Sequence, residues 1–250
     1  MKSALDTPLF YKQAIEEGNG RLETIDRCMV FAPHPDDETL GCGGLIATLR
    51  QAHRDVRVIF TTDGSMSHPN SRLFPIQRRI AIRKKEAISA LAILGVAADD
   101  ILFLNGKDSK LPGYGMDGYS EFAQVIQQEL LRFDPQLILV PYKLDPHCDH
   151  RSTWQLVNSA LDSSGKKVMV WEYPIWLYEL AAEGDIPQFN LIDLKYVNIE
   201  PFLELKKAAL GQHKSQITNL INDDPKGFIL EPNVISYFMT GCEYFIERRA

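Results

Sequence analysis

The fold is decided by the stretch from Val30 to Gly44, which reads VFAPHPDDETLGCGG. The stretch continues an apolar run that starts at Cys28 and is typical of a buried parallel strand. Prolines end the run, because proline has no donor for the strand ladder and fixes φ. Three carboxylates and one imidazole follow, directly before glycines and an apolar helical segment. The sequence therefore predicts a strand, a turn and a helix, with acidic groups at the edge where open α/β sheets bind ligands.

The charges of this turn point to a bound cation. Asp36, Asp37 and Glu38 stand next to one another, and such crowding is unfavourable unless a positive charge lies among them. A divalent metal held by His34 and one of the two aspartates meets this requirement. The alternative is a helix N-terminus whose acids only complement the helix dipole.

A second cluster follows another predicted strand. The apolar run 137–140 ends at a proline, and the segment HCDH follows from His147 to His150. A catalytic zinc usually takes three protein ligands and leaves the fourth position to water. Two histidine-containing blocks, each just beyond a strand, favour a metal site over the helix-dipole interpretation.

The two blocks resemble the LmbE-like, or PIG-L-type, zinc-dependent N-acetylglucosaminyl deacetylases. The similar segments are APHPDDE at 32–38 with the glycines after it, and HCDH at 147–150. The resemblance implies an α/β fold, a single Rossmann-like domain over 1–250 with a mostly parallel sheet flanked by helices. It also implies hydrolysis of an acetamide on an amino sugar. Residues 1–27 are expected to be an extension that packs on the domain, with a short helix over 9–17.

The resemblance assigns roles to the site residues. His34, Asp37 and His150 would hold Zn²⁺, or another divalent transition metal, whereas adjacency alone does not separate the two aspartates. Asp36 would then be free to act as the general base. His147 would stabilise the oxyanion or protonate the leaving amine.

Two more residues are expected to contact the substrate. Arg83 precedes Glu86 by three positions in a helix predicted over 76–94, so the pair shares one helix face. On the residue pattern this is a surface ion pair, whereas the resemblance places the arginine against the sugar. Asp108 follows a strand predicted at 101–104 and stands where the family carries a substrate-contacting aspartate, although the local pattern here departs from the usual Asp-Gly.

The rest of the chain continues the alternation of strands and helices. The patterns predict strands at 56–62, 167–173 and 196–199, and helices at 120–133, 152–161 and 202–211. Loops 66–75 and 107–119 are candidates to line the substrate site. In these loops, His68 is expected to be solvated, and Tyr114 and Tyr119 either stack on a sugar or pack the loop down. His213 is expected to be structural.

Composition excludes several classes of protein. The 250 residues carry a formal charge of −6, which argues against a nucleic-acid-binding protein. The basic residues between Arg78 and Lys85 are interpreted as a solvated helix face. Four cysteines without paired spacing favour a reduced, cytoplasmic protein. We expect no membrane span and no signal peptide, and a homo-oligomer is compatible with the sequence.

The sequence thus predicts a zinc-dependent hydrolase that removes the N-acetyl group from an N-acetylglucosamine-type conjugate. One alternative is a metal-dependent amidohydrolase of the same fold that acts on another small amide conjugate. A dinucleotide-binding protein is disfavoured, because Gly41, Gly43 and Gly44 lack the G-x-G-x-x-G spacing. A non-catalytic carbohydrate-binding protein is disfavoured because the expected site residues are all present.

Overall fold

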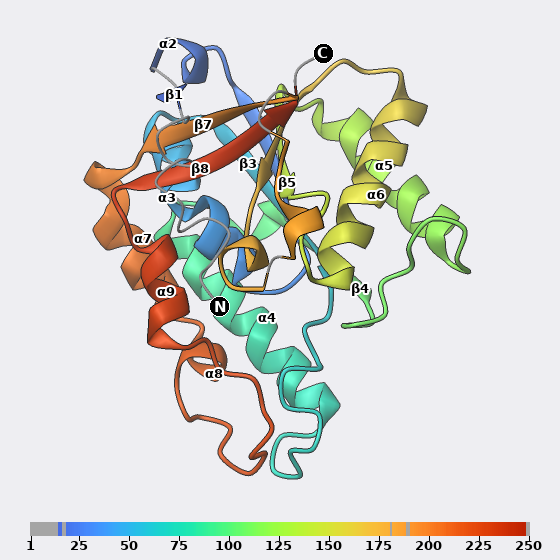
Figure 1. Cartoon of the computed structure of the whole chain (residues 1–250), viewed down its shortest axis with the longest axis vertical. Helices are drawn as coiled ribbons and strands as arrows, with labels where there is room; N and C mark the ends of the chain where they lie inside the picture. The colour runs from blue at the N-terminus through green and yellow to red at the C-terminus, as the bar shows by residue number, and fades with distance from the viewer. Residues whose placement is uncertain (1–14, 17–18, 181, 189–190, 249–250) are drawn as a thin grey trace.

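In the described part of the chain, eight strands form one sheet with helices on both faces (Figure 1). This computed structural model describes residues 15–16, 19–180, 182–188 and 191–248. The strands are β1 (Ile15–Glu16), β2 (Arg27–Ala32), β3 (Asp55–Thr62), β4 (Ile101–Gly106), β5 (Leu137–Pro141), β6 (Met169–Tyr173), β7 (Ile192–Asn198) and β8 (Cys242–Arg248).

The sheet is mostly parallel, as predicted. The strand order is β1-β7-β8-β6-β5-β2-β3-β4. Strand β8 is antiparallel to both β6 and β7, whereas the other neighbouring pairs are parallel. Strand β8 was not predicted from the sequence, because its segment CEYFIER mixes charged and apolar residues.

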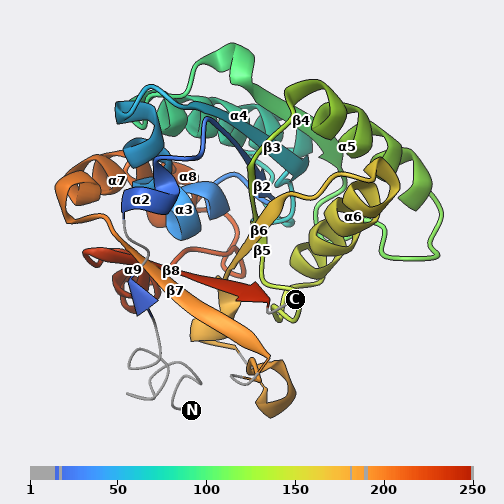
Figure 2. The same cartoon turned by 90° about the horizontal axis from the view of Figure 1, so that it is seen from above.

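Helices cover the sheet in two layers (Figure 2). On one face lie α3, α4 and α7, and on the other α5 and α6. The helices are α2 (Asn19–Leu22), α3 (Asp37–Gln51), α4 (Ile76–Ile93), α5 (Tyr119–Phe133), α6 (Cys148–Ser164), α7 (Leu203–Leu210), α8 (Lys214–Ile217) and α9 (Pro232–Phe238). Among the described helices, none is long and apolar enough to cross a membrane.

The pair of strands that positions the site is β2 and β5. They run parallel, with Cys28 opposite Leu137 and Val30 opposite Leu139, and all four side chains are buried. Parallel strands end at the same edge of a sheet, so the turn after β2 and the turn after β5 lie side by side. Both predicted site blocks follow directly from these turns.

The described N-terminal residues pack at one side of the sheet, where β1 is the outermost strand. Strand β1 pairs in parallel with β7, and Arg21 forms an ion pair with Glu247 on β8. Most of the helix predicted over 9–17 lies outside the described residues. Its described part, Ile15–Glu16, is a strand, so the prediction of a helix is wrong there.

The glycines of α3 permit close packing. A Cβ on Gly41 would lie 2.4 Å from the ring of Tyr173, and a Cβ on Gly44 would lie 2.5 Å from Ile199. Any larger side chain would therefore push α3 away from β6 and from the segment that follows β7. These glycines bring the helix close to the sheet, which explains the glycine-rich sequence without a bound dinucleotide.

A buried carboxylate fixes the middle of α3. Glu243 on β8 accepts hydrogen bonds from the backbone N–H groups of Gly44 (2.7 Å) and Leu45 (2.8 Å). The ammonium of Lys206 on α7 lies 2.7 Å from the same carboxylate, and both side chains are almost fully buried. Lys206 thus neutralises a charge that holds α3, the helix whose first turn carries the candidate site.

We expect Lys206→Met to destabilise the protein by about 3 kcal/mol, because it leaves the Glu243 carboxylate buried without its counter-charge. The free energy of unfolding in urea measures this loss. Lys207→Met is the matched control, since Lys207 is exposed and pairs with exposed Glu204. The control should lose less than about 1 kcal/mol, and equal losses in the two variants would contradict the role given to Lys206.

Candidate metal centre

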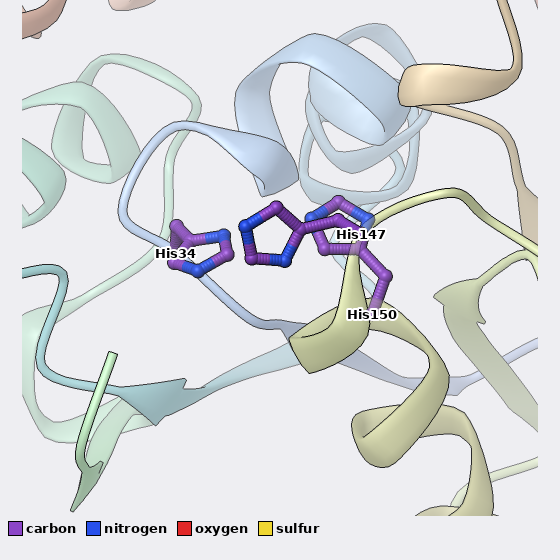
Figure 3. Close-up of side chains that lie close together, drawn as sticks. All are labelled: His34, His147 and His150. Atoms are coloured by element: carbon purple, nitrogen blue, oxygen red, sulfur yellow. The ribbon is translucent and has the colours of Figure 1, made fainter. Parts of the chain in front are cut away.

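The predicted metal ligands converge on one carboxylate oxygen. Oδ2 of Asp37, in the first turn of α3, lies 3.2 Å from Nδ1 of His34 and 3.3 Å from Nε2 of His150. His34 comes from the turn after β2 and His150 from the first turn of α6, and both are buried (Figure 3). Two segments far apart in the sequence therefore meet at a single point.

The outer nitrogen of each imidazole also faces a buried carboxylate. Nε2 of His34 lies 3.1 Å from Oδ2 of Asp149, and Nδ1 of His150 lies 3.3 Å from Oδ1 of Asp145. Metal-binding histidines in proteins usually have their second ring nitrogen held in this way. Neither aspartate was assigned a role from the sequence, and the only signals were that Asp149 is part of the HCDH segment and that Asp145 lies two residues before it.

The donor set fits a divalent transition metal. Both ring nitrogens of buried His150 lack a well-aligned hydrogen bond, although carboxylate oxygens lie near each. Burial would raise the pKa of Asp37, but the charges of His150 and His34 hold it well below its usual range. An ionised carboxylate with two imidazole nitrogens is a donor set that zinc and related ions prefer.

His147 is a third imidazole at this point. One ring nitrogen from each of His34, His147 and His150 lies within 4.8 Å of the others, so His147 is an alternative donor to Asp37. Its Nδ1 accepts a hydrogen bond from the backbone N–H of Asp149 (3.2 Å). Burial and the neighbouring His34 lower the pKa of His147 to about 4. The neutral ring therefore carries its proton on Nε2.

Asp36 is held in a strained conformation beside these groups. Its φ of 141° lies where residues other than glycine rarely occur. Its backbone N–H donates to Glu38 (3.0 Å), and its Oδ2 accepts from Nη2 of Arg83 (3.1 Å). Burial raises the pKa of Asp36 to about 6, against the opposing charge of Arg83.

Two arginines of α4, Arg79 and Arg83, are buried, so the expected solvated helix face is wrong for them, whereas Arg78 is exposed. The guanidinium of Arg83 also donates to the carbonyls of Gly64 (2.9 Å) and Pro35 (2.7 Å). Glu86 does not form the expected surface pair. It is buried and accepts from the N–H (2.8 Å) and hydroxyl (2.6 Å) of Ser215. Arg83 therefore faces the site, and whether it contacts a sugar stays a prediction.

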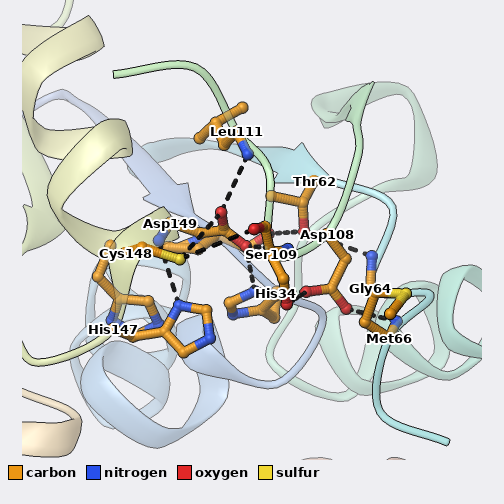
Figure 4. Close-up of polar contacts among 12 residues, drawn as sticks. His34, Thr62, Gly64, Met66, Asp108, Ser109, Leu111, His147, Cys148 and Asp149 are labelled. Carbon is orange, nitrogen blue, oxygen red and sulfur yellow. Dashed lines mark hydrogen bonds and ion pairs between the residues drawn. The ribbon is translucent and has the colours of Figure 1, made fainter. Parts of the chain in front are cut away.

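Asp108 also lies at the site. Its Oδ1 is 3.3 Å from Nε2 of His34, and its Oδ2 accepts from the backbone N–H of Met66 (2.7 Å) (Figure 4). Asp149 receives the N–H groups of Ser109 (2.7 Å) and Leu111 (3.1 Å) in the next residues of the same loop. The two aspartates thus fix loop 107–111 against His34.

Three residues of the surrounding loops are buried. His213 lies 3.3 Å from Glu38, in agreement with a structural role. His68 is buried beside Ser67, so the expectation of a solvated histidine is wrong. Tyr119 is buried and donates its hydroxyl to the carbonyl of Gln155 (2.9 Å). Tyr114 is exposed, and among the described residues neither tyrosine lines the cavity at the metal centre.

A cavity of about 420 Å³ opens over the metal centre. Its polar floor consists of His34, Asp36, Asp37, Arg83, Asp108 and His147. The floor therefore contains six of the seven residues singled out from the sequence, and His150 lies buried beneath it. A space of this size suits a small molecule such as one sugar unit with its substituents.

The chain is similar in sequence to known deacetylases. Residues 29–161 match the family model of the GlcNAc-PI de-N-acetylases, PIG-L. A diacetylchitobiose deacetylase of Thermococcus kodakarensis is 27% identical over 79% of this chain and 73% of its own. A probable N-acetyl-alpha-D-glucosaminyl L-malate deacetylase 2 of Bacillus cereus is 28% identical, over 78% of this chain and 86% of its own. A 1D-myo-inositol 2-acetamido-2-deoxy-alpha-D-glucopyranoside deacetylase of a Mycobacterium species is 25% identical, over 90% of this chain and 84% of its own.

Solved structures share the fold. The N,N'-diacetylchitobiose deacetylase from Pyrococcus horikoshii superposes with a TM-score of 0.67 at 22% identity, over 98% of this chain and 90% of its own. The conserved protein TT1542 from Thermus thermophilus superposes with a TM-score of 0.59 at 26% identity, over 78% of this chain and 80% of its own. The predicted α/β architecture is therefore confirmed.

We expect Asp145→Asn to weaken the binding of Zn²⁺ by about 10- to 100-fold, because the amide no longer holds the outer nitrogen of His150 as a carboxylate does. Competition with a chromogenic chelator measures the Kd. Asp117→Asn is the control, since Asp117 is exposed in loop 107–118. An unchanged Kd in the Asp145 variant would show that this carboxylate does not support the metal centre.

Proposed function

The chain belongs to the GlcNAc-PI de-N-acetylase (PIG-L) family of metal-dependent deacetylases, and from this premise we propose that it uses Zn²⁺ to remove the acetyl group from an N-acetylglucosamine-type conjugate. One observation carries the proposal. Two imidazoles and a carboxylate converge at the floor of a cavity, beside a second buried aspartate. This is the donor set and the neighbouring base that metal-assisted amide hydrolysis needs.

The metal would be held by His34, Asp37 and His150. When bound there, Zn²⁺ supplies two effects: it lowers the pKa of a water molecule to roughly 7, and it polarises the acetyl carbonyl. Asp149 and Asp145 orient the two imidazoles by facing their outer nitrogens. Their negative charges also make the imidazoles better electron donors.

Asp36 would accept the proton of the attacking water. It lies next to the ligand Asp37 in sequence, lines the cavity, and is oriented by Arg83 and by the backbone bond to Glu38. A carboxylate fixed in this way needs little rearrangement before it takes a proton. Arg83 therefore positions the base, in addition to the contact with the sugar predicted for it.

His147 would act on the acetamide itself. Because its Nδ1 accepts the Asp149 N–H, its neutral ring presents an Nε2–H group. That group can donate a hydrogen bond to the carbonyl oxygen as negative charge develops there. The other role predicted for His147, protonation of the leaving amine, would require the ring to take up a second proton first. Asp108, on the cavity floor beside His34, would accept a hydrogen bond from a sugar hydroxyl.

The proposed location is the cytoplasm. All four cysteines are free thiols, and two of them, Cys28 and Cys42, are buried. Thiols of this kind persist in a reducing compartment.

We expect the protein to release acetate from N-acetylglucosamine conjugates, and a chelator to abolish the release by removing the ion that activates water. Acetate is measured with and without the chelator, and Zn²⁺ is then added back. Recovery of activity on add-back supports the proposal, and release that persists in the metal-free protein contradicts it. Hydrolysis of acetanilide but of no acetamido sugar would instead support the alternative of another small amide substrate.

We expect Asp36→Asn to retain Zn²⁺ and to lose activity by about two to four powers of ten, because the amide cannot accept the proton. Acetate release gives kcat, and metal content is measured on the same sample. His150→Ala is the contrasting variant, since it should lose the metal as well. An Asp36 variant of normal activity would assign the base to another residue.

A further inference from the structure

The cavity above the metal centre is also lined by apolar side chains, which we call the apolar wall. The wall is made by residues from four separate segments: Leu40, Met66, Trp176, Leu180, Phe228 and Leu230. Trp176 and Phe228 meet edge to face, with ring centroids 5.7 Å apart. The proposed reaction uses none of these side chains, so they need another explanation.

The wall exposes more apolar surface than folding alone requires. Leu180 is 57% exposed and Phe228 is 38% exposed, and Met66 is also accessible. These side chains gather at one cavity, whereas isolated exposed apolar residues are common on any surface. An exposed apolar cluster beside polar catalytic groups marks a place where a ligand is bound.

Backbone hydrogen bonds hold the wall in place. The N–H of Phe228 donates to the carbonyl of Ser67 (2.6 Å), and the N–H of Leu230 donates to the carbonyl of Gln216 (2.7 Å). The N–H of Trp176 donates to Asp145 (2.9 Å), the aspartate that also faces His150. The wall is therefore preformed and has a fixed position relative to the metal centre, which favours binding.

The described side chains around the cavity offer no free cation to an anionic ligand. Among the described residues that line it, Arg83 alone carries a permanent positive charge. Its guanidinium is 4% exposed and already bonds to Asp36, Pro35 and Gly64. Asp36, Asp37 and Asp108 add negative charge to the floor. The divalent metal of the proposed function would offset these charges. The described side chains that line the cavity therefore leave no free cation to bind a carboxylate or phosphate on the substrate.

We propose that the substrate carries a neutral, apolar group, alkyl or aryl, that packs against this wall while its acetamide lies at the metal centre. The inference rests on the proposed function and specifies the substrate class. Such a group can be attached at the anomeric oxygen of the sugar or can extend the acyl chain on nitrogen. Both carry the same chemistry, and the experiment separates them.

The test compares kcat/KM of the zinc-loaded protein for four glucosamine derivatives. Methyl N-acetylglucosaminide is the reference, and the hexyl glycoside carries the apolar group at the anomeric oxygen. Methyl N-hexanoylglucosaminide carries the apolar group on nitrogen. The fourth compound, N-acetylglucosaminyl malate, carries negative charge at the anomeric position. We expect one of the two apolar substrates to exceed the reference by about tenfold or more, through a lower KM. The better of the two identifies the position of the group.

Substitutions in the apolar wall test whether the wall causes the preference for the apolar substrate. Leu180→Ala and Phe228→Ala should bring the ratio of kcat/KM between the better apolar substrate and the reference toward one. Leu131→Ala is the matched control, because Leu131 is 50% exposed on α5 and does not line the cavity. It should preserve the ratio. Leu180 is largely exposed, so its variant keeps the test valid if loss of Phe228 impairs folding.

Several outcomes would overturn the inference. Equal kcat/KM for the apolar substrates and the reference, or preference for the malate conjugate, would show that the wall does not select an apolar group. An unchanged ratio in both wall variants would show that the preference arises elsewhere. Failure to release acid from any of the four substrates would instead overturn the proposed function, and this inference with it.

Discussion

The structure depends on the parallel pairing of β2 with β5. Val30 lies opposite Leu139 in the buried centre of the sheet, so the turns after the two strands share one edge. That register places His34 and His150 on either side of Asp37. A slip of one residue would move Val30 or Leu139 from one hydrophobic core into the other, where its shape does not fit, and this disfavours any other register. The site geometry is thus set by hydrophobic burial in the strands.

The pairing also brings together charges that need compensation. Asp37, Asp145 and Asp149 are buried around two imidazoles, and each carboxylate is paired or hydrogen-bonded. The chain stabilises this cluster with backbone N–H groups, among them those of His34, Ser109 and Leu111. Asp145 has a second role, since it receives the Trp176 N–H from the apolar wall as well as facing His150. Metal centre and wall therefore share one anchor.

The sequence was informative where a short pattern decides the structure. The apolar runs of β2 and β5 and the turn residues after them predicted the fold and brought His34, Asp37 and His150 together. It was not informative where distant loops supply the partners. Arg79 looks like a solvated residue in the helical pattern, yet carbonyls of Ser65 and Phe74 satisfy its buried guanidinium. No local pattern reveals such partners, and the same holds for the burial of His68.

The polar floor and most of the apolar wall of the cavity come from different parts of the chain. The family model matches residues 29–161, and this segment contains the metal centre, Asp36, Arg83 and Asp108. Trp176, Leu180, Phe228 and Leu230 lie beyond it and form most of the apolar wall. In the proposed function, the chemistry of the acetamide is thus built from the segment that the family model matches. Contact with the rest of the substrate would depend on segments beyond it, which lie outside the β2–β5 pair.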